Sequence, residues 1–104
     1  MFDRAITLEF YVNSDKELYV EYNTKKYLFS DFWQNVQDSK QICRLMYDAF
    51  RKKHPDKFES ASSGAKNWEE IFLKIVNNHF RQYDKFYDVF IRTNGEVKFM
   101  LEDE

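Results

Sequence analysis

The residue types that most often carry out chemistry in proteins are few and scattered in this chain. Two histidines, His54 and His79, and a single cysteine, Cys43, are isolated from one another, and no CxxC or HxxxH pair occurs. Adjacent Glu69 and Glu70 stand at the expected start of a helix, where the positive end of the helix dipole favours acids. The chain contains only two glycines, so a glycine-rich phosphate loop is also excluded. These patterns predict no enzyme, no metal site and no cofactor.

The sharpest short motif is His54-Pro55-Asp56-Lys57, which follows three basic residues at positions 51–53. It resembles the His-Pro-Asp loop of the J-domain family, whose members contact Hsp70 partners through that tripeptide and the preceding basic helix. The resemblance implies a co-chaperone in which His54, Pro55 and Asp56 contact an Hsp70. The same string is also typical of a plain helix stop, in which Pro55 ends a helix and Asp56 caps a turn.

Length and composition predict one small globular domain over residues 1–104. A chain of 104 residues holds one hydrophobic core, and 19% aromatic residues should dominate that core. A formal net charge of -2 gives no overall attraction to nucleic acid or to an anionic membrane. No apolar run approaches the roughly 20 residues needed to cross a bilayer. The lone cysteine and the absence of a signal-peptide layout favour a cytoplasmic location.

The N-terminal segment alternates apolar and polar side chains from Ile6 to Val12, and the alternation resumes from Leu18 to Tyr22. A period of two is typical of strands with one buried face. Turn-forming residues at 13–16 separate the two runs and predict an antiparallel hairpin. A second turn then leads to a short extended piece, Lys26 to Phe29, as an optional edge strand.

The central segment predicts two helices joined by a loop. Ser30 is a good N-cap for the first helix, whose apolar stripe runs to Phe50. Polar residues around Asp38 interrupt that stripe and predict a kink or break, and Pro55 marks the end. Residues 56–66 lack periodicity and predict a mobile loop.

Asn67 opens the second helix, because Asn67 and Glu70 have the spacing of a capping box. Apolar side chains then recur at helical spacing at Trp68, Ile71, Phe72, Ile75, Val76, His79 and Tyr83. On this stripe we expect His79 to be a hydrogen-bonded core or boundary residue, and we expect Cys43 to be a small core residue of the first helix.

The C-terminal segment predicts a hairpin in which Phe86–Arg92 pairs with Glu96–Leu101 around Asn94-Gly95. A two-residue loop would mix charged and apolar side chains on one face. A three-residue loop over 93–95, with Gly95 left-handed, pairs Arg92 with Glu96 and adds a cross-strand ion pair. This register unites the apolar side chains of Tyr87, Val89, Ile91, Val97, Phe99 and Leu101.

Together these elements predict an α+β fold in the order ββ(β)ααββ. Strands from both chain ends should form one antiparallel sheet of four to five strands, with two helices covering one face. The outer face should then carry Thr7, Glu9, Tyr11, Glu17, Tyr19, Glu21, Asp88, Phe90, Arg92, Lys98 and Met100.

That outer face is the sequence's best indication of function. Exposed aromatic residues beside acids suit a protein partner, so we expect a small non-enzymatic interaction module, such as an inhibitor, immunity or accessory protein that masks its partner. Tyr11, Tyr19, Phe90 and Met100 are the expected anchors, and a second copy of the chain is another occupant of the face. Nucleic-acid binding is a further alternative, with basic residues near the helix junction and aromatic residues for stacking, but interleaved acids would repel phosphates.

Overall fold

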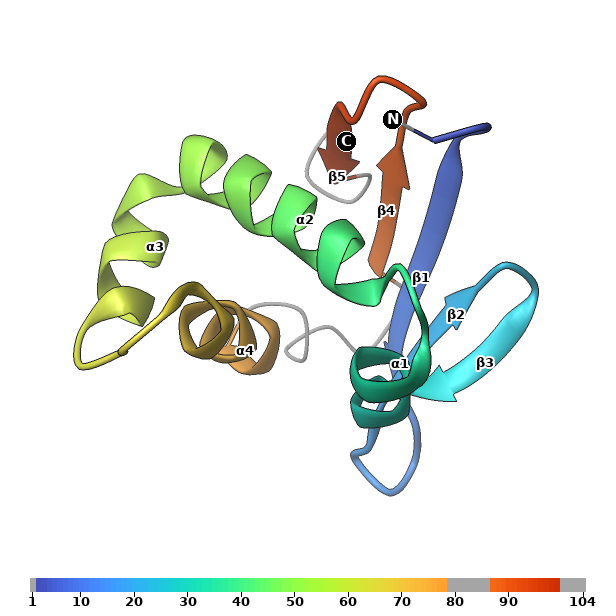
Figure 1. The fold of residues 1–104 in the computed structure, drawn as a ribbon. Helices are drawn as coiled ribbons and strands as arrows, with labels where there is room; N and C mark the ends of the chain where they lie inside the picture. The colour runs from blue at the N-terminus through green and yellow to red at the C-terminus, as the bar shows by residue number, and fades with distance from the viewer. Residues whose placement is uncertain (1, 79–86, 100–104) are drawn as a thin grey trace.

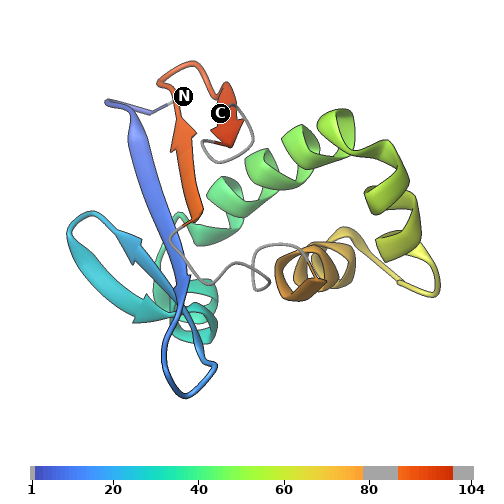
Figure 2. The ribbon, with the colours of Figure 1, turned by 180° about the vertical axis from the view of Figure 1, so that it is seen from behind.

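The computed structural model describes residues 2–78 and 87–99 and shows an antiparallel sheet with helices on one side (Figures 1 and 2). The α+β class predicted from the sequence is confirmed. The elements in chain order are β1 (Ile6–Val12), β2 (Leu18–Tyr22), β3 (Lys25–Leu28), α1 (Phe29–Asn35), α2 (Ser39–Lys53), α3 (Pro55–Ser62), α4 (Trp68–Asn78), β4 (Tyr87–Ile91) and β5 (Val97–Phe99).

The five strands pair in the order β3-β2-β1-β4-β5, with every pairing antiparallel. The N-terminal strand β1 therefore lies in the middle, and its pairing with β4 joins the hairpins from the two ends of the chain. The optional third strand is present as β3, although it ends at Leu28 because Phe29 already belongs to α1.

The first hairpin forms because its turn residues and its alternating apolar and polar side chains favour the same pairing of β1 with β2. The side chain of Asn13 accepts hydrogen bonds from the backbone amides of Asp15 and Glu17, at 3.1 and 2.8 Å. Lys16 adopts a positive φ of 65° to complete the reversal. Leu8 and Phe10 consequently point into the core, as the alternation predicts.

The C-terminal hairpin has the predicted three-residue loop. Gly95 has a φ of 91° and donates its amide to the carbonyl of Arg92 at 2.8 Å, while the Arg92 amide donates to Glu96 at 2.8 Å. Val89 lies opposite Phe99, and all three of Val89, Ile91 and Phe99 are buried. The bond from the Arg92 amide to the Glu96 carbonyl joins these two residues, but the expected ion pair between their side chains is not among the described contacts. The expected core position Leu101 lies outside the described residues, as do His79, Tyr83 and Phe86.

The predicted break near Asp38 is confirmed, because α1 ends at Asn35 and α2 begins at Ser39. The buried Ser39 hydroxyl donates to the carbonyl of Trp33 at 3.0 Å and ties the two helices together. The prediction that Ser30 caps the first helix is wrong. The helix begins at Phe29 directly after β3, without a side-chain cap, because burial of the Phe29 ring draws this residue into the first turn.

The predicted loop over 56–66 is also wrong in its first half, where α3 spans Pro55–Ser62. Proline suits the first position of a helix, since its missing amide would have no partner there. Phe58 then packs edge-on against Tyr47 of α2 at 5.5 Å, and Ala61 is buried, so tertiary contacts stabilise a helix that shows little periodicity. As predicted, Asn67 caps α4 by accepting from the Glu70 amide at 3.0 Å.

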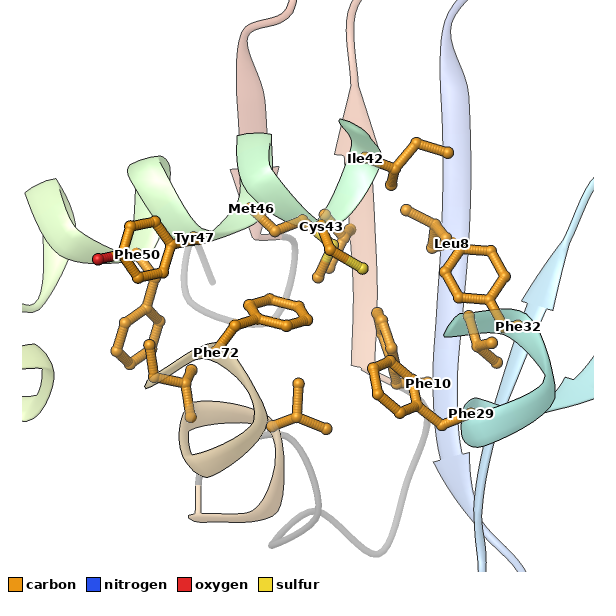
Figure 3. Close-up of a cluster of buried hydrophobic side chains, with 14 of the residues drawn as sticks. Leu8, Phe10, Phe29, Phe32, Ile42, Cys43, Met46, Tyr47, Phe50 and Phe72 are labelled. Carbon is orange, nitrogen blue, oxygen red and sulfur yellow. The ribbon is translucent and has the colours of Figure 1, made fainter. Parts of the chain in front are cut away.

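The core lies between the sheet and the helices, with Leu8 and Phe10 of β1 facing Phe32 and Phe72 (Figure 3). Helices α1 and α2 contact the strands, whereas α3 packs against both α2 and α4. Trp33 of α1 stacks on Phe72 of α4 at 5.8 Å and links the two parts of the helix layer. The predicted pair of helices is thus a layer of four in the described part of the chain, and no helix of that part covers the other face of the sheet.

Candidate functional site

The outer face of the sheet, which no described helix covers, carries three of the four predicted anchors, Tyr11, Tyr19 and Phe90. In Figure 2, β1, β2 and β3 lie in front of α1, so this view looks toward that face. The register of β1 with its neighbours arranges the side chains in cross-strand rows. Two of these rows are aromatic in part, and an acidic row lies between them.

Tyr11 and Tyr19 form the first row. They are register partners on β1 and β2, and their rings stack with centroids 5.6 Å apart and an interplanar angle of 12°. Both side chains are half-buried. The ammonium of Lys26 lies 5.6 Å from the Tyr11 ring, within the range of a cation–π contact. The result is a flat aromatic surface with one cation at its border.

Glu21, Glu9 and Asp88 form the second row, which we call the acid row. Glu9 on the central strand lies opposite Glu21 of β2 on one side and opposite Asp88 of β4 on the other. Directly opposed residues have Cβ atoms about 5 Å apart, and like charges in that position destabilise a sheet. Lys26 of β3 lies directly opposite Glu21 and is thus the cation next to this row among the described residues.

The environment of the acid row favours protonation of Glu9 and Asp88. Burial, the negative charges of Asp88 and Glu21, and a hydrogen bond with Glu21 raise the pKa of Glu9, while Lys26 acts in the opposite direction. Burial also raises the pKa of Asp88. One oxygen of Asp88, Oδ1, is buried and accepts no hydrogen bond from the described residues. Asp88 is thus a carboxylate of the outer face with one buried oxygen that has no hydrogen-bond donor among the described residues.

Phe90 lies on the other side of the acid row. It is half-buried, faces Thr7 of β1 and Lys98 of β5, and shares its strand face with Asp88. Thr7 and Tyr11 are four residues apart on β1, so the two aromatic positions are separated by about 13 Å along the strand. The fourth predicted anchor, Met100, lies outside the described residues.

His54, Pro55 and Asp56 lie at the junction of α2 and α3 and are not part of this face. The His54 amide donates to the Phe50 carbonyl at 2.8 Å, and the His54 carbonyl accepts from the Phe58 amide at 2.9 Å. The imidazole packs against the Phe50 ring at 5.1 Å. His54 is thus the single residue between α2 and α3. Pro55 and Asp56 belong to the first turn of α3, where Asp56 is exposed.

Several of the basic residues near this junction are engaged with aromatic rings. The Arg44 guanidinium lies 4.9 Å from the Tyr47 ring and 5.2 Å from the Trp68 ring, and Arg51 lies 5.0 Å from Phe58. These cations support the packing of α2 against α3 and α4. They are separated from the aromatic residues of the outer face by the thickness of the core.

The other chemically active groups have structural surroundings. Cys43 is 0% exposed, and burial strongly raises the pKa of its thiol. Within residues 2–78 and 87–99, no group of histidine, cysteine and acidic side chains is arranged to hold a metal ion. No helix in the described part of the chain is long and apolar enough to cross a membrane.

The acid row is the feature that sequence reasoning missed. The sequence pattern places Glu9, Glu21 and Asp88 on the outer face but does not predict that they form one row. The opposition of Glu9 and Glu21 follows from the local hairpin and could have been found from its turn. The opposition of Glu9 and Asp88 depends on pairing between strands from the two ends of the chain, and no local signal reports that register.

Comparison of the chain with models of protein families, with curated proteins and with solved structures finds no match. The functional argument therefore rests on the outer face itself.

Proposed function

We propose that the chain is a small non-enzymatic interaction module whose outer sheet face binds a basic segment of a partner protein. Occupation of that segment would mask it, which is the mode of action of inhibitor, immunity and accessory proteins. The observation that carries the proposal is the acid row, with Glu9 held between Glu21 and Asp88.

The acid row indicates a binding function because its like charges destabilise the folded sheet. Three carboxylates side by side in the middle of a sheet repel one another, and threonine or valine would suit the central position of Glu9 better. Local conflicts of this kind are expected at functional sites. A lysine or arginine from a partner would reverse the sign of the interaction, since each cation could neutralise two neighbouring carboxylates.

The aromatic residues on either side of the acid row supply the apolar part of such an interface. The stacked pair Tyr11 and Tyr19 and the half-buried Phe90 resemble the aromatic anchors that contribute most to protein–protein affinity. Charge complementarity in the centre would set orientation and speed of association. A basic, extended segment is therefore the occupant with the best chemical fit.

Site-specific cross-linking tests this proposal. A photoreactive amino acid at position 19, on the outer face, is compared with the same group at Glu59, which is exposed on α3. Cross-linked peptides from the native source are identified by mass spectrometry. The expected result is cross-linking to lysine- or arginine-rich peptides from position 19 and not from position 59.

Two charge-introducing substitutions complete the test. Tyr19→Lys together with Phe90→Lys should abolish capture of the same partner, while Glu59→Lys should leave it intact, with the fold of each variant checked by circular dichroism. Capture of acidic peptides, equal cross-linking from both positions, or full capture by the Tyr19→Lys and Phe90→Lys variant would contradict the proposal.

A further inference from the structure

A groove with a volume of about 610 Å³ opens at one end of the acid row, between the start of β1 and the turn that joins β2 to β3. Both Glu9 and Glu21 contribute to its wall. The groove is thus continuous with the outer face, and a volume of this size falls within the usual range of about 300–1,000 Å³ for ligand sites.

The groove exists because β2 ends before β1 does. The last register pair of β1 and β2 is Leu8 with Tyr22, whereas β1 continues along β4 to Ile6. Asn23 and Thr24 both adopt positive φ angles, 53° and 65°, and turn the chain away into β3. At this end β1 and β2 are therefore no longer paired, and the groove lies in the gap between them.

The lining of the groove is acidic with an aromatic wall. Asp3, Glu9, Glu21 and Asp38 line it, against one cation, Arg4. Tyr22 also lines it, and the Tyr22 ring packs edge-on against Phe32 on the helix side of the sheet, with ring centroids 5.5 Å apart, so this wall is anchored to the core. Burial and the charge of Asp38 raise the pKa of the Tyr22 phenol, which keeps this hydroxyl neutral.

We infer that this groove receives an arginine side chain from the basic segment that the outer face binds. A planar guanidinium carries five donors in a fixed geometry, so it can pair with the register partners Glu9 and Glu21 together. A lysine ammonium is more strongly hydrated and acts as a point charge, so it gains less from two adjacent carboxylate acceptors. The inference rests on the proposed function and specifies the chemistry of its partner.

Three peptides of the same length test the inference. The probes are acetyl-Gly-Arg-Gly-Arg-Gly-amide, its lysine counterpart and its neutral citrulline counterpart, each titrated into the full chain at low salt and followed by amide NMR. The arginine peptide should shift the amides of Thr7, Asn23 and Thr24, which line the groove. The lysine peptide should bind about tenfold more weakly, and the citrulline peptide should not bind.

Matched variants separate the groove from general electrostatic attraction. Glu21→Gln with Asp38→Asn removes two groove carboxylates and should weaken arginine-peptide binding about tenfold or more. Asp15→Asn with Glu59→Gln removes the same net charge at exposed positions away from the groove and should leave binding within about twofold.

The outcomes distinguish this inference from the proposed function. Equal affinity for the arginine and lysine peptides, shifts confined to amides outside the groove, or equal weakening in both variants would overturn the groove as a guanidinium site. If position 19 still cross-links a basic partner in that case, the proposed function stands without the groove. If position 19 captures no basic segment while the arginine peptide binds the groove, the broader proposal fails and the site remains.

Discussion

Replacing Glu9 by glutamine should make the protein more stable at neutral pH. Glutamine keeps the size and the polar end of the side chain but removes its charge. Because Glu9 lies between Glu21 and Asp88, the substitution removes both like-charge oppositions of the acid row at once.

The expected gain is about 1 kcal/mol. Like charges directly opposite in a sheet cost roughly 0.2–1 kcal/mol for each pair, and Glu9 takes part in two such pairs. Lys26 offsets part of the repulsion, and partial exposure to solvent screens the remainder. For a chain of this size, about 1 kcal/mol raises Tm by about 5 °C.

The sign of the pH dependence follows from the raised pKa of Glu9. The folded state binds the proton more tightly than the unfolded state, whose carboxyl has the ordinary value of 4.5. The penalty is therefore fully present above the folded pKa and is lost as the pH falls through it to below 4.5. The stability difference between Glu9→Gln and wild type should shrink to zero over that window. The raised pKa of Asp88 acts in the same direction on both proteins.

Urea unfolding followed by fluorescence of Trp33 and Trp68 measures the effect, because guanidinium salts would screen the carboxylates. Glu59→Gln on α3 is the control and should change stability by less than about 0.5 kcal/mol. A Glu9→Gln variant that is less stable than wild type, or a gain independent of pH, would refute the repulsion argument. The same variant should bind the partner more weakly, since it gives up charge complementarity for stability.

Two further predictions concern the core and the second hairpin. The buried thiol of Cys43, whose pKa is raised by burial, should react with a disulfide reagent only on unfolding; rapid labelling of the native protein would contradict its position. Gly95→Ala should lower the free energy of unfolding, measured in urea, by about 1 kcal/mol, because a φ of 91° disfavours a residue with a Cβ. Gly95→Asn should lower the free energy of unfolding by less, since asparagine tolerates positive φ better. An alanine variant as stable as wild type would argue against the left-handed loop.

The elements that could be predicted from the sequence are those whose cause is local. The alternation from Ile6 to Val12 and the Asn13 turn lie within one short segment, and both dictate the first hairpin. The C-terminal register could be chosen because only a left-handed Gly95 unites the apolar face of β4 and β5. Short-range conformational preferences and burial agreed in these segments.

The parts that could not be predicted depend on contacts between distant residues. Helix α3 forms because Phe58 finds the ring of Tyr47 and Ala61 is buried, neither of which is visible in the sequence of residues 55–62. The start of α1 at Phe29 likewise follows from burial of its ring rather than from the capping preference of Ser30. Tertiary packing overrides local propensity at both sites.

The acid row shows where fold and function separate. The register that buries Val89 and Ile91 against the helices necessarily turns Asp88 outward beside Glu9, so the core determines where these side chains lie. It does not determine what they are, because threonine at either position would leave the buried face unchanged and remove a repulsion. Carboxylates at these positions therefore have no cause in the packing of the sheet. A cationic partner supplies one, and the opposite effects expected of Glu9→Gln on stability and on binding test that explanation directly.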